Sequence, residues 1–243
     1  MGLIHRKTAS YIRDVSIDNQ HNKYTNIKIG SKHTGLLFSG QCIIDVTYHQ
    51  GVAWFGTKKD VKPRQPDTPQ AQFKKLCLHL LWMRPFSLFR QLLSYQCNLL
   101  AQYSKDELLS PDQLSITGLE HVRGFQKNYS GNKGLCLKQE IALHNPCSFT
   151  PLLLPLQLLA ALDVGYLPHV SSMDPKLGNK PAALVSWACG GKYNGTWISA
   201  DFTYAKPFKK TKHLADCTYQ IYANITFQLH NIFRLGATRK KLP

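Results

Sequence analysis

Acidic residues are scarce in this chain of 243 residues. Asp and Glu number 14 against 30 Lys and Arg, which gives a formal net charge of +16. Such an excess of positive charge favours polyanionic partners, because lysines and arginines that bind phosphates release counterions. The composition therefore predicts nucleic acid, either single-stranded DNA or RNA, as a partner.

Long apolar runs are also missing. The longest, from Leu152 to Leu162, is about half of what a membrane-spanning helix needs and contains Pro155. The first ten residues carry charge without an apolar core, which argues against a signal peptide. From the sequence we expect a protein that is not secreted and does not bind a membrane.

The motifs of common metal, phosphate and disulfide sites are absent. The seven cysteines are widely spaced with no CxxC pair, so we expect reduced thiols. Cys136, His144 and Cys147 lie close in sequence, but a fourth zinc ligand at a standard spacing is missing. Gly190-Gly191-Lys192 lacks the frame of a phosphate-binding loop. We predict no metal and no cofactor.

The sequence contains no complete catalytic motif. His169 lies in LPHVSSM, an HxS element like those of phosphodiesterases with paired catalytic histidines, but a second such element is not present. A hydrolase that uses Cys147 or His169 is therefore only the third hypothesis for function. We expect a protein that is not an enzyme.

Alternation of apolar and polar residues predicts strands in two parts of the chain. In CIIDVTYH, Ile44, Val46 and Tyr48 alternate with polar residues, and strands are expected over 24–57. At the other end, antiparallel strands are expected over 182–235. The longest alternates without a break from Tyr219 to Leu229, so its apolar face needs a facing sheet, as in a sandwich or a closed barrel.

The segments between these strands are interpreted differently. Residues 58–70 are proline-rich and basic, which is typical of a surface linker. Over 71–117 apolar residues such as Phe73, Leu76 and Leu80 recur at helical spacing, so a helical insertion is predicted, interrupted at Pro85. The block 149–166 fits either a buried helix or core strands, and 236–243 is a basic tail. A single domain over 1–243 is expected.

Lysine and arginine clusters are the candidate contacts to nucleic acid. Phe208 lies within one cluster and could stack on a base. The predicted binding residues are Lys58, Lys59, Lys62, Arg64, Lys206, Phe208, Lys209, Lys210, Lys212, Arg239, Lys240 and Lys241.

The C-terminal third is similar to the end of the single jelly-roll capsid proteins of small single-stranded DNA viruses, circovirus-like or densovirus-like. The resemblance rests on a hairpin, a basic link, the strand YQIYANITFQLHNIFRL and the segment LPHVSSMDPKL. It implies a virion protein that self-assembles and is also found in the host nucleus or cytoplasm.

The fold and function expected from the sequence follow from these patterns. We expect a mainly β protein with a helical insertion, as an antiparallel, jelly-roll-like β-sandwich, with an α+β fold as the alternative. The leading hypothesis for function is a non-enzymatic, homo-oligomeric capsid-like protein that binds nucleic acid through its lysine clusters. The alternative is an RNA-binding component of a ribonucleoprotein, such as a ribosome-associated protein.

Overall fold

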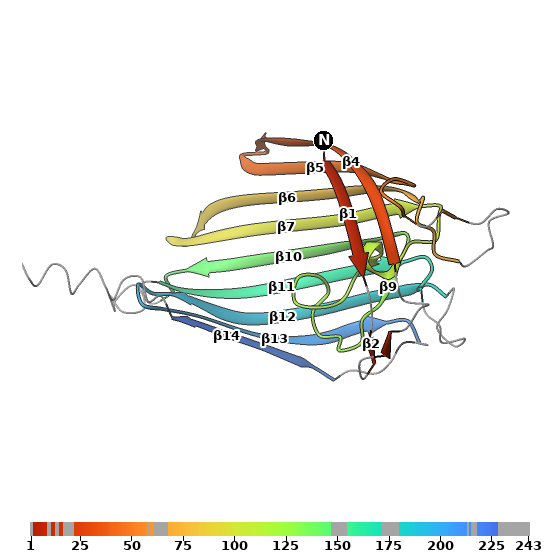
Figure 1. The fold of residues 1–243 in the computed structure, drawn as a ribbon. Coiled ribbons are helices and arrows are strands. Elements are labelled where there is room, and N and C mark those ends of the chain that lie inside the picture. The colour runs from red at the N-terminus through yellow and green to blue at the C-terminus, as the bar shows by residue number, and fades with distance from the viewer. Residues whose placement is uncertain are drawn as a thin grey trace, which may run out of the picture.

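One antiparallel sheet of ten strands makes up most of the protein (Figure 1). The computed structural model describes residues 2–8, 11–12, 15–16, 22–57, 59–60, 68–146, 155–171, 180–212, 214 and 218–227. The sheet strands, in spatial order, are β1 (Gly2–Thr8), β4 (Asn22–Leu37), β5 (Gly40–Val52), β6 (Lys74–Leu88), β7 (Gln91–Ser104), β10 (Gly134–His144), β11 (Leu156–Leu167), β12 (Ala182–Asn194), β13 (Ile198–Lys210) and β14 (Gln220–Phe227). Each sheet strand pairs with the next one along the chain, which makes the sheet a meander.

Short elements lie outside this sheet. A pair of two-residue strands, β2 (Tyr11–Ile12) and β3 (Val15–Ser16), separates β1 from β4. Between β7 and β10 lie the 3-10 turn η2 (Ser110–Asp112) and the paired strands β8 (Leu114–Ser115) and β9 (Ser130–Gly131).

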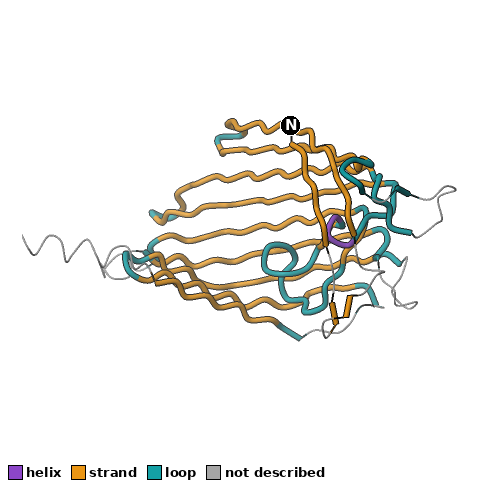
Figure 2. The backbone as a smooth tube through the Cα atoms, in the orientation of Figure 1, coloured by secondary structure: helices purple, strands orange, loops and turns teal. Residues whose placement is uncertain are grey.

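The sheet curls at one edge. Figures 1 and 2 show β1 and part of β4 crossing steeply in front of the middle strands, while β6, β7, β10 and β11 run side by side. The segment between β7 and β10 lies on the same front side. The curled edge and this segment therefore share one face of the sheet.

The connections differ between the two ends of the strands. Two-residue turns join β4 to β5 at Phe38–Ser39 and β6 to β7 at Phe89–Arg90, and all four residues have positive φ, between 49° and 65°. Two positive φ values in a row match the type I′ turn, whose twist fits that of the strands. The connections at the opposite end, such as 105–133 and 168–181, are long.

The two faces of the sheet have different chemistry. Along β6, Leu76, Leu78 and Leu80 lie on one face and Lys75 and His79 on the other. Strand pairing places apolar residues beside apolar residues: Leu80 is paired with Ile44 on β5 and with Leu99 on β7.

We call these the apolar face and the polar face. Exposed side chains on the apolar face include Val46, Tyr48, Leu76, Tyr103, Leu135, Ile141, Leu158, Leu162, Tyr166, Trp187, Phe202, Ile221, Ile225 and Phe227. The polar face includes Lys28, Asp45, Thr47, His79, Gln96, Asn98, Gln102, Lys138, Glu140, His144, Gln157, Asp163, Lys192 and Asp201. Among the described residues, no second sheet covers the apolar face.

The predicted helical insertion over 71–117 is wrong. That region forms β6 and β7, followed by the irregular start of the segment that leads to β10. Leu76, Leu78 and Leu80 alternate with period two, as in a strand. Leu81 and Met83 add apolar residues on the polar face, and with them the sequence also fits helical spacing. Pro85 lies two residues after Met83, the last β6 residue paired with β5, so its missing N–H costs no bond to β5.

The jelly-roll sandwich and the α+β alternative are also wrong. A sandwich buries the apolar face of one sheet against another. Here the apolar side chains of β14 are exposed, with Ile225 at 63% and Phe227 at 67%. The block 149–166, for which the sequence allowed either a buried helix or core strands, contains most of β11. Most of the linker at 58–70 and all of the tail at 236–243 lie outside the described residues.

Candidate functional site: an insert anchored on the polar face

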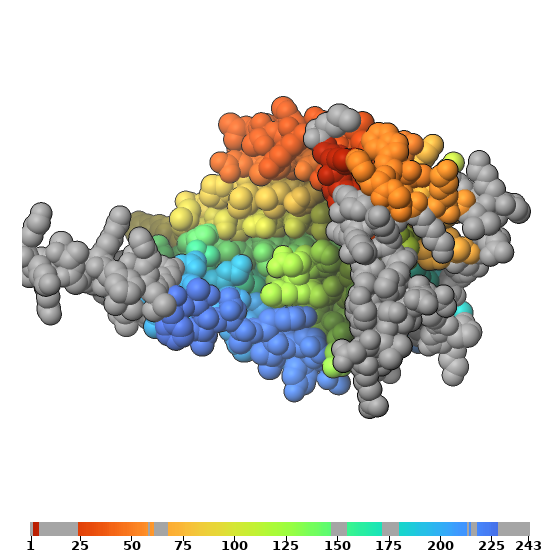
Figure 3. All heavy atoms as spheres, viewed as in Figure 1, coloured from red at the N-terminus to blue at the C-terminus, as the bar shows by residue number. Residues whose placement is uncertain are grey.

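Residues 105–133, which we call the insert, connect β7 to β10 and cross the polar face of the sheet. Figure 3 shows part of the insert, in yellow-green, over the middle of this face. Its own fold is held by polar contacts: Thr117 Oγ1 donates to Asn128 Oδ1 at 2.9 Å, and the Tyr129 N–H donates to Thr117 Oγ1 at 3.1 Å. The insert is therefore a folded element rather than a simple strand connection.

Arg123 fixes the second half of the insert to the sheet. Its Nε and Nη2 donate to the two carboxylate oxygens of Asp163, on β11, at 2.7 and 2.8 Å, and Nη1 donates to Glu140 Oε1, on β10, at 2.6 Å. The backbone N–H of Arg123 also donates to Asp163 Oδ2, at 3.1 Å. Two parallel charge-assisted bonds give both strength and a fixed orientation. We call these three residues the Arg123 anchor.

The Arg123 anchor is buried. Arg123 is 1% exposed and Asp163 is fully buried. Burial lowers the pKa of the Arg123 guanidinium, but the hydrogen bonds and charges of Asp163 and Glu140 outweigh that effect and raise it. The arginine therefore stays charged within the Arg123 anchor.

Two glycines make room for this anchor. Gly165, on β11, faces the insert, and a Cβ there would lie 2.7 Å from Val122 Cγ2. Gly124 has φ +89°, a left-handed conformation that glycine adopts readily, and a Cβ there would lie 3.2 Å from Pro207 Cδ. Close approach of the insert to the sheet thus depends on small residues on both partners.

Apolar packing supports the anchor. The buried cluster around it joins the insert to β10, β11, β12 and the segments that follow β11 and β13. Its members are Ile116, Val122, Phe125, Tyr129, Cys136, Leu167, Val170, Ala182, Leu184 and Leu214.

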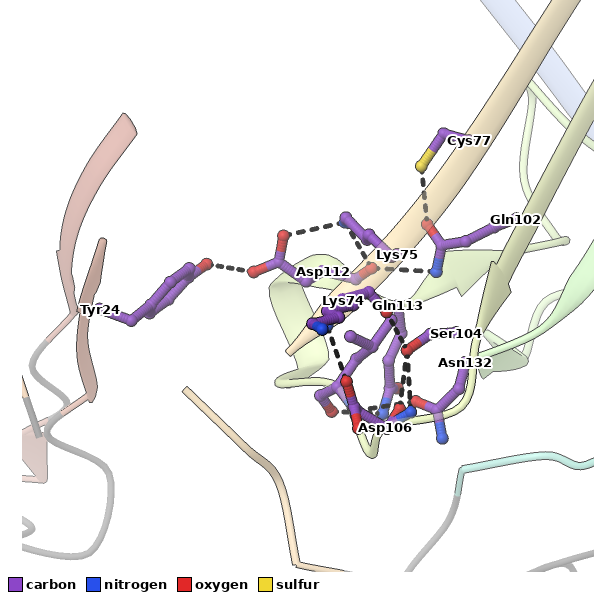
Figure 4. Close-up of polar contacts among 11 residues, drawn as sticks. Tyr24, Lys74, Lys75, Cys77, Gln102, Ser104, Asp106, Asp112, Gln113 and Asn132 are labelled. Carbon is purple, nitrogen blue, oxygen red and sulfur yellow. Dashed lines mark hydrogen bonds and ion pairs between the residues drawn. The ribbon is translucent and has the colours of Figure 1, made fainter. Parts of the chain in front are cut away.

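A second polar cluster holds the first half of the insert (Figure 4). Asp112, at the end of η2, accepts hydrogen bonds from the hydroxyl of Tyr24 on β4 and from Lys75 Nζ on β6, the latter at 2.9 Å. Its backbone oxygen accepts from Lys75 Nζ at 2.8 Å and from Gln102 Nε2 on β7 at 3.1 Å. We call these four residues the Asp112 anchor. Tyr24 also belongs to a small buried cluster with Phe73, Leu108 and Leu109.

The sequence reasoning missed both anchors. Arg123 lies in a glycine- and lysine-rich stretch, and Asp163 lies in the apolar block 149–166. The available signal was the charge of Asp163 inside LLAALDVGYL, because a carboxylate among core residues needs a cationic partner. The identity of that partner, 40 residues away, was not readable.

The predicted nucleic-acid residues are only partly gathered. Lys206, Phe208, Lys209 and Lys210 lie on β13, and Lys212 follows that strand. Lys59 lies in the connection between β5 and β6, two strands that are far from β13 in the strand order. The remaining six, Lys58, Lys62, Arg64, Arg239, Lys240 and Lys241, lie outside the described residues. Individual roles for these side chains stay predictions.

The other candidate chemistry is not assembled where the structure describes it. Cys136 and His144 both lie on the polar face of β10, eight residues apart, which is roughly 26 Å at about 3.3 Å per residue. Cys147 is outside the described residues, and His169 is exposed after β11. Within the described ranges, no group of three or more His, Cys, Asp or Glu is placed to hold a metal ion.

Apolar and polar residues that alternate along antiparallel strands of this length are typical of sheets with lipid on one face and water on the other. Over the part of the chain that the structure describes, no helix is long and apolar enough to cross a membrane.

The sequence matches a known family model, described as haemolysin secretion/activation protein ShlB/FhaC/HecB, over residues 1–193. This match covers most of the chain, so the chain belongs to the ShlB/FhaC/HecB family.

Individual relatives agree with the family model. The outer membrane transporter CdiB of Escherichia coli is 30% identical over 222 residues, covering 91% of this chain and 36% of that protein. The hemolysin transporter protein HpmB of Proteus mirabilis is 27% identical over 151 residues, covering 60% and 27%. The solved structure of CdiB from Escherichia coli has a TM-score of 0.79 at 28% identity and covers 92% of this chain and 41% of the solved one. The chain spans about a third of the length of the CdiB relatives it matches.

These findings overturn the resemblance to viral capsid proteins. The family is one of secretion and activation proteins, and its named relatives are the outer membrane transporter CdiB and the hemolysin transporter protein HpmB. A capsid-like protein, an RNA-binding ribonucleoprotein component and a Cys/His hydrolase are therefore wrong as functions. Nucleic acid as partner, the absence of membrane contact, and the virion, nucleus or cytoplasm as location are wrong for the same reason.

Proposed function

We propose that this chain forms part of the wall of a transmembrane β-barrel in a bacterial outer membrane, and that the insert occupies the channel. The observation that carries this proposal is the alternation of apolar and polar residues through β4–β14, with the anchored insert on the polar face. In a bilayer the apolar face meets lipid, and the polar face lines water.

The strand lengths support this proposal. β6 has 15 residues and β7 has 14, more than the ~9–11 that a tilted strand needs to cross a bilayer. Backbone N–H and C=O groups at an open sheet edge are costly in lipid, so a spanning sheet must close. In the proposed channel, further strands pair with the two edges formed by β1 with β4 and by β14.

The connections suggest an orientation. Outer-membrane barrels have short turns on the periplasmic side and longer loops outside the cell. The turns at Phe38–Ser39 and Phe89–Arg90 then lie toward the periplasm. The insert begins at the extracellular end and folds back into the channel.

The insert bears on what the channel does. Its buried charges neutralise one another in ion pairs instead of facing a substrate, which supports a non-enzymatic role. The family description and the name of HpmB point to haemolysin secretion. We infer that the exported cargo is a protein of haemolysin type, for which the insert has to make way.

Reconstitution of the purified protein in planar lipid bilayers tests this proposal. We expect discrete single-channel currents. Gln96→Lys, on the polar face, should change the anion-to-cation permeability ratio, because a charge in the lumen acts on passing ions. Ile141→Val, on the apolar face, is the control and should leave the ratio unchanged. Protein that inserts into bilayers yet never conducts would contradict the proposal.

A further inference from the structure

Asp112 is held by three strands at once. Both of its carboxylate oxygens and its backbone oxygen accept hydrogen bonds, from Tyr24 on β4, Lys75 on β6 and Gln102 on β7. Figure 4 shows Tyr24 and Lys75 approaching the carboxylate from different sides. One residue of the insert thus ties the β4–β7 part of the sheet together.

The Asp112 anchor shares nothing with the Arg123 anchor. Arg123 is held by β10 and β11, which follow β7 in the strand order, and no residue takes part in both anchors. Between them lies Gly118, with φ +116° and nothing within 4 Å of where a Cβ would stand. The insert is therefore fixed at two separate places, with an uncrowded glycine between them.

The central ion pairs of the two anchors differ in depth, although Glu140 beside Arg123 keeps 14% of its side chain exposed and Tyr24 beside Asp112 is 1% exposed. Lys75 and Asp112 each keep 8% of the side chain exposed, whereas Arg123 and Asp163 keep 2% and none. The Arg123 anchor lies beside a buried cluster of ten residues, and Tyr24 of the Asp112 anchor belongs to one of four. A buried ion pair recovers hydration when it opens into water, so its net cost of opening is modest. The shallower anchor has less packing to lose.

We propose that the Asp112 anchor is the release point of the insert: Lys75 and Tyr24 position its first half in the closed channel, and this half leaves first while Arg123 remains attached. This inference rests on the proposed function. Lys75, Tyr24 and Asp112 are positioning residues in this role, because they act on the channel through the insert.

Channel recordings on single variants test the release point. Asp112→Asn and Lys75→Met each leave one partner without its counter-charge, and Tyr24→Phe removes one donor at nearly constant volume. Each should raise the open-to-closed ratio in planar bilayers by about tenfold, the change in an equilibrium constant that follows from losing one hydrogen bond to a charged group. The matched control is Lys105→Met, an exposed lysine at the start of the insert, which should leave the ratio unchanged.

A double variant separates positioning from general damage. Lys75→Met combined with Asp112→Asn removes both charges and leaves an amide oxygen that can still accept from the Tyr24 hydroxyl. Neither charge is then left buried and unpaired, so the ratio should return toward the wild-type value. Far-UV circular dichroism checks that each variant folds. If a charge variant does not fold, the open-to-closed ratio of Tyr24→Phe tests the release point instead. A wild-type ratio in Tyr24→Phe, or a double variant as open as the single ones, overturns the release point. Wild-type protein that never conducts overturns the proposed function instead.

Discussion

Replacing Arg123 by alanine is expected to loosen the insert and to lower the free energy of unfolding by about 3–5 kcal/mol. The value follows from removing one member of a buried ion pair: Asp163 is fully buried and would lose the guanidinium that compensates its carboxylate. Four hydrogen bonds to Asp163 and Glu140 involve Arg123, and three come from the side chain that is lost.

The conservative variant refines that magnitude. Arg123→Lys keeps the charge but cannot reproduce the fork that binds both oxygens of Asp163. Losing one charge-assisted bond costs about 1.5–3 kcal/mol, so this variant should fall between the wild type and Arg123→Ala. Because Arg123 and Asp163 are in direct contact, the effects of Arg123→Ala and Asp163→Ala should also be non-additive.

Urea unfolding in lipid vesicles, followed by tryptophan fluorescence, measures these differences. Trp187 on β12 reports on the sheet near Asp163, since it pairs with Leu162 on β11. Lys127→Ala is the control, because Lys127 is an exposed cation in the same insert. The reasoning is refuted if Arg123→Ala unfolds within about 0.5 kcal/mol of the control, the usual range for surface changes, or if the double variant equals the sum of the single ones.

Other variants probe the close approach of the insert and the lipid-facing surface. Gly165→Val places a side chain against Val122 and should cost about 1–3 kcal/mol by overpacking, seen as a lower urea midpoint. Gly124→Ala should cost about 1–2 kcal/mol in the same assay, because alanine is strained at a left-handed φ. Leu80→Arg, on the apolar face of a central strand, should cost about 2–4 kcal/mol and reduce insertion into vesicles, whereas Gln96→Arg on the polar face should insert normally; equal insertion of the two would count against the assignment of faces.

Period-two alternation was readable where each polar position carries a polar residue. CIIDVTYH indicated a strand, and this stretch lies in β5. In β6 the same alternation was hidden, because Leu81 and Met83 occupy the polar face and add matches at helical spacing. Pairing with β5 and β7 decides that case, and a local window contains neither strand.

Alternation of apolar and polar residues along a strand also does not show whether protein or lipid covers the apolar face. The pattern from Tyr219 to Leu229 was interpreted as a strand that needs a facing sheet. A strand that faces lipid has the same alternation, and only the neighbouring strands show which applies. Ile221 and Ile225 belong to an apolar face that continues across the sheet.

The two anchors could not be predicted from local sequence patterns, because their partners are far apart in the sequence. Arg123 meets Asp163 and Glu140 at separations of 40 and 17 residues, and Asp112 meets Tyr24 at 88. A lone arginine in a glycine-rich stretch has no short-range signature. Its partners become apparent only when the strands are placed in register.

Side-chain exposure to lipid tests the central claim most directly. Cys97 lies on the apolar face of β7, and Gln96 next to it lies on the polar face. Single-cysteine proteins, one keeping Cys97 and one carrying Q96C, can be spin-labelled in vesicles and measured by paramagnetic relaxation. We predict that oxygen, which concentrates in lipid, relaxes the label at 97 more strongly, and that a water-soluble nickel chelate relaxes the label at 96 more strongly. Equal access of the chelate to both labels would contradict a sheet with one face in lipid.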